Sequence, residues 1–263
     1  MKRTLTVILL LTSLLLIGAD AKTKKKEKPP KPPCAASLEV CAREGCSADN
    51  HHDPQLNRLK NLKSSNKPVD ERSLTWMIKR EQAVKDSGYK KGDPRTKLTN
   101  LDEGTQARVV GYLLAVKKEG AESCNCGLGM VDVETDNHLV LVNPKTITDF
   151  PLPAHASKQT LTAIFHERET QSVTVEFTPR VRADGHPNFT RKIQSILNKT
   201  PQGALWVRVT GQLMFDSEHF GQKTPVRATS WEIHPIMNLE FCPQGKTCKK
   251  DSNDNWVDLD DLP

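Results

Sequence analysis

Aromatic side chains are scarce in this sequence, and no apolar run is long enough to span a membrane. Aromatic residues make up 5% of the 263 residues, so the chain offers few flat platforms on which nucleic-acid bases could stack. Trp206 beside Arg208 is the one suitable pair, and Trp206 is equally consistent with a core position. The longest apolar run, residues 5–19, is shorter than the roughly 20 residues that a transmembrane helix needs. We therefore predict no permanent membrane span, with an anchor as the alternative.

Recognisable catalytic motifs are also missing. The sequence has no G-x-S-x-G nucleophile elbow, no phosphate-cradling glycine loop and no dinucleotide fingerprint. His166-Glu167 lacks the second histidine that the helical zinc-protease motif requires. Most hydrolases and nucleotide-dependent enzymes therefore have no positive support.

The N-terminus is typical of a secretory signal peptide. Lys2 and Arg3 precede the apolar run, and Ala19-Asp20-Ala21 follows it as the small-x-small pattern that signal peptidase cuts. We predict cleavage after Ala21 and a periplasmic or extracellular location. No cysteine stands at the cleavage point, which disfavours a lipid anchor.

A basic arm follows the predicted cleavage point. Residues 22–33 contain six lysines, one glutamate and four prolines, a composition that predicts a disordered tether. This arm carries +5 and the signal peptide +1, which together equal the whole formal charge of +6. The remainder is neutral, so the basic pI gives little support for nucleic-acid binding. Contact of Lys22 to Lys31 with an anionic wall polymer or membrane is the alternative function of the arm.

Seven cysteines in an exported chain predict disulfides: Cys34, Cys41, Cys46, Cys124, Cys126, Cys242 and Cys248. The odd number leaves at least one thiol free or bonded to another chain. A zinc site made by the first three with His51 and His52 is the alternative, although paired C-x2-C knuckles are missing. Cys124 and Cys126 are too close for an easy mutual bridge. We expect one of them to pair with Cys242 and so join the two ends of a barrel.

The body of the chain changes from helix to strands near residue 101. Residues 34–100 read as an N-terminal appendage with one helix at 71–86, capped by Asp70 and ended by Gly88. Residues 243–263 read as an acidic, disordered tail. Between them, apolar residues predict five strands, at 107–116, 138–142, 172–178, 205–215 and 226–241, of which 172–178 alternates cleanly. The short, fully apolar second strand is expected to extend back through 129–134 as one arm of a hairpin. A helix capped by Asn188 is predicted after the third strand, and residues 144–170 fit either a short helix or a long loop.

Three strands, a helix and two strands follow one another in the order of an OB-fold barrel. Glycines inside the first and fourth strands, Gly111 and Gly211, suit strands that bend around a small barrel. We predict a mainly β protein with an OB-like five-stranded barrel over residues 101–242. A β-sandwich is the alternative.

Several stretches resemble exported bacterial proteins of unassigned function with such a C-terminal barrel. They are Arg208-Val-Thr-Gly-Gln-Leu-Met-Phe-Asp216, Arg227-Ala-Thr-Ser-Trp-Glu-Ile-His-Pro235, Asp53-Pro-Gln-Leu-Asn57 and Lys60-Asn61. The resemblance covers most of the chain. It implies a bacterial origin and identifies no catalytic residue.

One candidate site lies on the third and fifth strands, which can be neighbours in an OB barrel. Glu232 and His234 share one face of the fifth strand, and Glu176 on the third strand would lie near them. A histidine with two carboxylates is suited to binding a divalent cation or to acid–base chemistry. The simpler interpretation is that Glu232 pairs with Arg180 or Arg227 on the exterior and that His234-Pro235 turns the chain.

A second candidate group would lie on the rim of the barrel, where OB domains commonly bind ligands. It comprises Asp136, His138, Asp216, Glu218 and His219. Acidic loop residues are often only solvated, which is the alternative here.

These observations favour a noncatalytic exported binding module over an enzyme. Its ligand, a protein, a glycan or a nucleic acid, is left open, as is any cofactor. The alternative is a metal-dependent phosphodiesterase with Glu176, Arg180, Asp136 and Arg208 as its working parts. Metal carriage and a purely structural function are further possibilities.

Overall fold

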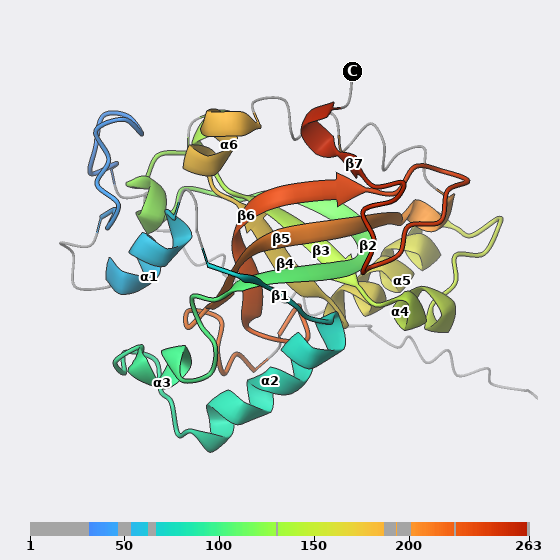
Figure 1. Ribbon diagram of the computed structural model, residues 1–263, viewed down its shortest axis with the longest axis horizontal. Coiled ribbons are helices and arrows are strands. Elements are labelled where there is room, and N and C mark those ends of the chain that lie inside the picture. Colours follow the sequence, from blue (N-terminus) through green and yellow to red (C-terminus); the bar gives the residue numbers. More distant parts are fainter. Residues whose placement is uncertain are drawn as a thin grey trace, which may run out of the picture. The chain divides into compact units, whose positions relative to one another are not determined.

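Five strands close into a barrel in the computed structural model (Figure 1). They are β2 (Gln106–Lys118), β3 (Asn137–Val142), β4 (Val173–Phe177), β5 (Leu205–Phe215) and β6 (Trp231–Phe241). The order is β2-β3-β4-β6-β5, and β5 pairs back onto β2. Only the β4–β6 pairing within this ring is parallel, at Val175 and Ile233. The helix α6 (Pro179–Gly185) lies between the third and fourth barrel strands in sequence, so the predicted OB-like order is confirmed.

The structure describes residues 32–46, 54–62, 67–129, 131–186, 193, 201–223 and 225–261. The predicted signal peptide with its cleavage point after Ala21, and the arm from Lys22 to Lys31, lie outside them, as do His51 and His52. Within these residues no helix combines the length and the apolar character that crossing a membrane requires.

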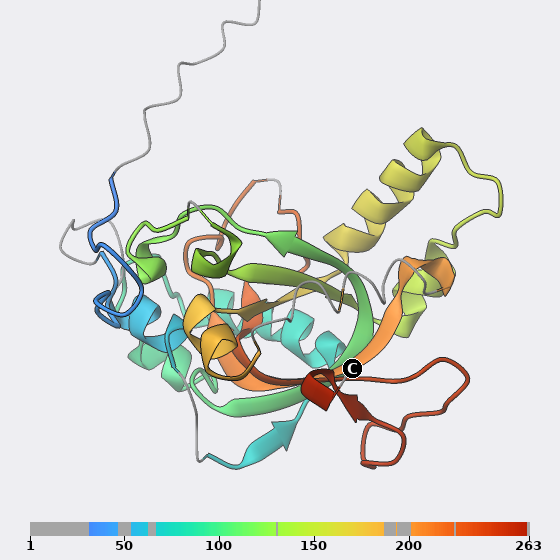
Figure 2. The ribbon, with the colours of Figure 1, turned by 90° about the horizontal axis from the view of Figure 1, so that it is seen from above.

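Shorter elements surround the barrel. The strand β1 (Val69–Glu71) pairs in parallel with β2, and β7 (Val257–Asp258) pairs with β6. The helices are α1 (Pro54–Lys60), α2 (Leu74–Asp86), α3 (Thr96–Thr99), α4 (Pro144–Asp149) and α5 (Lys158–Thr170). Figure 2 shows α5 projecting away from the barrel. The sequence of residues 144–170 fits either a short helix or a long loop. In the structure this stretch contains two helices, α4 and α5.

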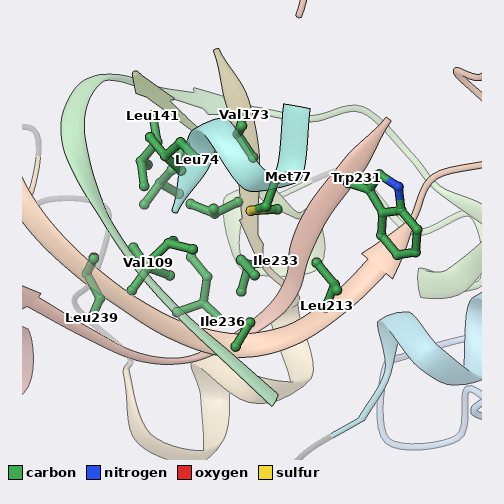
Figure 3. Packing of buried hydrophobic residues seen from close by; sticks show 14 of the residues in the cluster. Leu74, Met77, Val109, Leu141, Val173, Leu213, Trp231, Ile233, Ile236 and Leu239 are labelled. Carbon is green, nitrogen blue, oxygen red and sulfur yellow. The ribbon is translucent and has the colours of Figure 1, made fainter. Parts of the chain in front are cut away.

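Apolar side chains that alternate along the strands fill the barrel. Val109, Leu113, Val175 and Ile233 are fully buried there, and α2 contacts β2, β4 and β6. Figure 3 shows Leu74 and Met77 of α2 among the core residues. This amphipathic helix thus completes the core of the barrel.

The predicted start of α2 is wrong by three residues, and its predicted end is confirmed. Asp70 and Glu71 belong to β1, and Ser73 caps the helix by accepting a hydrogen bond from the Trp76 N–H at 3.0 Å. Gly88 follows the helix with a φ of +65°, a conformation that suits glycine.

Other predicted boundaries also move. Residues 129–134 do not extend β3, because Asp132–Glu134 forms a 3-10 turn, and β6 begins at Trp231 instead of Val226. The helix predicted from Asn188 lies outside the described residues, except for Ile193, which is helical and buried.

The disulfides differ from the predicted barrel-closing bridge. Cys34 bonds to Cys46, Cys41 to Cys126 and Cys242 to Cys248, while Cys124 is a free, buried thiol. The predicted use of the first three cysteines in disulfides is confirmed, but the bridge from Cys124 or Cys126 to Cys242 is wrong. A short loop after β6 returns Cys248 to Cys242, whereas the loop of Cys126 packs on the N-terminal segment: the Cys34 N–H donates to the Cys126 carbonyl at 2.9 Å. Disulfides suggest an oxidising, exported compartment.

The C-terminal segment is folded, which contradicts the predicted disordered tail. Val257 and Asp258 pair with Phe241 and Glu240 of β6, and Leu259 is buried. Apolar residues placed among the aspartates explain the difference, because they supply contacts with the barrel that acidic composition alone does not suggest.

Candidate functional site on a covered face of the barrel

Glu176, Glu232 and His234 point away from the barrel core yet are almost fully buried. They alternate with core residues along β4 and β6, but their exposed fractions are only 1%, 0% and 0%. The helix α1 and the loop around the 3-10 turn Ser123–Asn125 cover this face. Gln212 of β5 links α1 to β6, since its side-chain amide donates to the carbonyls of Leu59 in α1 and His234 in β6 at 3.0 and 3.1 Å.

The parallel pairing of β4 with β6 brings these three residues together. His234 Nδ1 lies 3.1 Å from Glu232 Oε1 and 3.3 Å from Glu176 Oε2. On the other side of the ring, Nε2 lies 3.4 Å from Asp136 Oδ2. Burial opposes a charge on this imidazole, but Glu176, Asp136 and Glu232 outweigh it and raise the pKa of His234 to about 10.

A second histidine connects the buried cluster to solvent. His138 Nε2 lies 2.6 Å from Glu176 Oε1, and its Nδ1 lies 2.9 Å from Glu119 Oε1. Although burial disfavours the charged ring, Glu176 and Glu119 raise the pKa of His138 to about 11. Burial likewise opposes ionisation of Glu176, yet His138 and His234 hold the pKa of this carboxyl well below its usual range. A carboxylate between two imidazolium rings is thus favoured.

Arg227 organises the neighbouring carboxylates. Its guanidinium donates to Glu232 Oε2 at 2.9 Å and to Asp216 Oδ2 at 2.6 Å. Asp216 also pairs with His219. Despite burial, His219 and Arg227 keep the pKa of Asp216 well below its ordinary value. Of the two partners that the simpler interpretation left open for Glu232, Arg227 is the one found, and the pair is buried and not on the barrel exterior.

The covering loop supplies further polar groups. Asn125 donates to Asp136 Oδ1 at 2.8 Å, and Lys60 of α1 lies 3.0 Å from Glu122 Oε2. Burial raises the pKa values of Glu122 and of the Cys124 thiol. These neutral or paired groups close the cluster from the side opposite the strands.

A cavity of about 470 Å³ opens beside the cluster. Its lining includes Lys60, Glu119, Glu122, His138, Glu176, Asp216, His219 and Arg227. Asp136 and His234 are not among the lining residues.

The structure separates three other predicted residues from this cluster. Arg180 donates to the carbonyls of Cys41 and Ala42, and Arg208 binds both carboxylate oxygens of Glu240 at 2.6 and 2.5 Å. The Trp206 ring packs against Tyr112 with centroids 4.9 Å apart. Sequence reasoning in turn missed Lys60, Glu119, Glu122, Cys124 and Asn125 as neighbours of the site. The stretch containing Asn57 and Lys60 did stand out in the sequence, but nothing in it indicated contact with β6.

Protein-family models, curated proteins and solved structures were all compared with the chain, and none of them matches it. The chemistry of the site must therefore be interpreted from its own residues.

Proposed function

We propose that this protein is an exported binding module and that its ligand is a divalent cation held by Asp136, Glu176 and His234. The observation that carries the proposal is that ligand atoms of these three side chains all lie within 4.8 Å of one another, in a buried position. Imidazole and carboxylate groups are common ligands of Zn²⁺ and of other divalent transition metals.

Two buried atoms in this group support the proposal because they make no hydrogen bond to any described residue, although each lies 3.3–3.4 Å from a partner of opposite charge. They are Glu176 Oε2 and His234 Nε2. Leaving a buried polar atom without a hydrogen bond costs about 1–3 kcal/mol, so native proteins rarely do so without a functional reason. A cation between Asp136, Glu176 and His234 would bond to both atoms.

The charge balance supports a cation over an anion. Around the cluster, the carboxylates Glu119, Glu122, Asp136, Glu176, Asp216 and Glu232 face the fixed cations Lys60 and Arg227. Both fixed cations are already paired with carboxylates. Of the histidines, only His234 binds the metal and loses its ring proton. His138 and His219 stay paired with carboxylates. Even with both of these rings charged, six carboxylates face four cations, and this acidic excess stabilises the ion.

The test is metal binding by the oxidised mature chain after chelator treatment. Isothermal titration with Zn²⁺, Co²⁺ and Ca²⁺ should show one saturable site for at least one of them. D136N, E176Q and H234Q should each weaken it by about tenfold or more, because each removes one ligand. E218Q is the matched control, since Glu218 lines the same cavity but pairs with Lys91 outside the cluster. Absence of binding by the wild type, or unchanged affinity in folded variants, would refute the proposal.

Metal-dependent hydrolysis of phosphodiesters is the second candidate function. It is favoured by the cavity next to Glu176, whose lining includes Lys60 and Arg227; a phosphate would have to compete for these cations with the carboxylates that they already pair with. Arg180 and Arg208 are engaged elsewhere and do not contribute. Incubation with single-stranded DNA and Ca²⁺, Mg²⁺ or Zn²⁺ decides between the two: cleavage that E176Q abolishes favours the hydrolase, and intact DNA excludes it.

A further inference from the structure

Cys124 is the one cysteine of the seven that forms no disulfide, and it lies against the proposed cation site. Its exposed fraction is 1%. The Sγ atom lies 3.3 Å from Glu122 Oε2 and 3.9 Å from Asp136 Oδ2. The thiol therefore points at carboxylate oxygens instead of packing among apolar side chains.

Asp136 connects the thiol to the histidine. Its Oδ1 is occupied by the hydrogen bond from Asn125, whereas its Oδ2 faces both Cys124 Sγ at 3.9 Å and His234 Nε2 at 3.4 Å. Two groups of possible metal ligands consequently share Asp136: one adds Glu176 and His234, and the other adds Glu122 and Cys124. Cys124 does not lie within 4.8 Å of Glu176 and His234 as the members of each group do, so its side chain must turn toward them to join their ion. An outer hydrogen bond that fixes a ligating carboxylate, as Asn125 does here, is typical of metal sites.

We propose that Cys124 is the fourth ligand, beside Asp136, Glu176 and His234, and that the ion is therefore Zn²⁺ or a chemically similar transition metal. This inference rests on the proposed function and narrows its ligand. A thiolate is a strong ligand for Zn²⁺, whereas Ca²⁺ and Mg²⁺ select oxygen ligands. Binding would replace the S–H bond of Cys124 by a metal–sulfur bond and release the thiol proton and the His234 ring proton to solvent, with no change of oxidation state.

Four protein ligands would also decide between the two candidate functions. Structural zinc sites are closed by four protein ligands, while catalytic sites keep one position for water. A site completed by Cys124 has no such position. The inference thus favours binding of the metal over metal-activated hydrolysis.

Cobalt substitution tests the assignment. Titration of the oxidised, metal-free mature chain with Co²⁺ should produce the near-ultraviolet charge-transfer band of a cobalt–thiolate bond, and Zn²⁺ should remove it. C124S should lose this band and weaken Zn²⁺ binding by about tenfold or more. The matched control is the double variant C242S/C248S, which removes a disulfide bonded away from the cluster and should keep the band.

A measurement on the wild type guards against a variant that does not fold. Zn²⁺ should slow alkylation of the Cys124 thiol by iodoacetamide in partly unfolding urea, and Ca²⁺ should not. If Co²⁺ binds through Asp136, Glu176 and His234 without a thiolate band and C124S binds Zn²⁺ normally, this inference is overturned while the proposed function stands. If neither Co²⁺ nor Zn²⁺ binds, both fail.

Discussion

Arg227 shows at the residue scale how much the buried cluster depends on one side chain. It is 8% exposed and hydrogen-bonds to Glu232 and Asp216, which are also buried. We expect R227M to lower the free energy of unfolding by about 3–5 kcal/mol, because two buried carboxylates would lose the guanidinium that they share and keep only His219 and His234 as ion-pair partners. Urea denaturation followed by circular dichroism measures this change.

The matched control is K145M, which removes the exposed pair of Lys145 with Asp149. It should change stability by no more than about 0.5 kcal/mol. A loss below about 1 kcal/mol in R227M would mean that solvent reaches the carboxylates and that the cluster is not as buried as described.

His219 and Asp216 give a prediction on pH dependence. Their ion pair raises the pKa of His219 and lowers that of Asp216. The histidine contributes fully below its unfolded pKa, about 6.5, and its contribution is lost as the pH rises through the folded value. The aspartate contributes fully above about 3.9 and loses its contribution as the pH falls through its folded value. The pair should therefore stabilise most between about pH 4 and 6.5.

The stability difference between the wild type and H219Q tests this in chelator-containing buffer. We expect it to be largest near pH 5.5 and smaller at pH 8.5. It should stay below about 1 kcal/mol because the His219 side chain is 44% exposed. A difference that does not change with pH would contradict the assigned pair.

At the scale of elements, the close approach of β5 to β6 depends on Gly211. A Cβ atom at this position would lie 2.4 Å from the Pro235 carbonyl oxygen and 2.6 Å from Ile233 Cγ2. We expect G211A to destabilise the protein by about 1–3 kcal/mol, since the backbone must move. G120A is the control, because nothing lies within 4 Å of a Cβ atom there. Equal melting temperatures of the two variants would show that the strands can separate without cost.

The elements differ in how well the sequence predicts them. The alternation of Val173, Val175 and Phe177 with polar residues predicts β4 and the face on which Glu176 lies, because the strand period is local. The order of strands then predicts the contact of β4 with β6, and so the meeting of Glu176 with Glu232 and His234. Neither Cys124 nor Lys60 could be placed in this way. Lys60 lies on the short helix α1, which contacts β6, and Cys124 lies on a loop that contacts α1. Neither contact has a periodic signal in the sequence.

For the whole molecule, the three disulfides should contribute unequally to stability. Cys41–Cys126 closes a separation of 85 residues, whereas Cys242–Cys248 closes one of 6. In the chain-entropy model, these correspond to about 4–5 and about 2 kcal/mol. We therefore expect C41S/C126S to lower the free energy of unfolding more than C242S/C248S does under nonreducing conditions. The opposite ranking would show that native contacts outweigh chain entropy in this protein.

The Cys41–Cys126 bond, whose second cysteine lies two residues after the free Cys124, also determines how the protein must be prepared. Material produced in a reducing cytoplasm would carry seven thiols instead of one. The sulfur atoms of Cys34, Cys46 and Cys126 lie within 4.8 Å of one another, so their thiolates would capture zinc on their own. A zinc titration of such material would report a site that the oxidised protein does not offer. A count of one thiol per chain, measured with Ellman's reagent in denaturant, should therefore precede every metal-binding experiment.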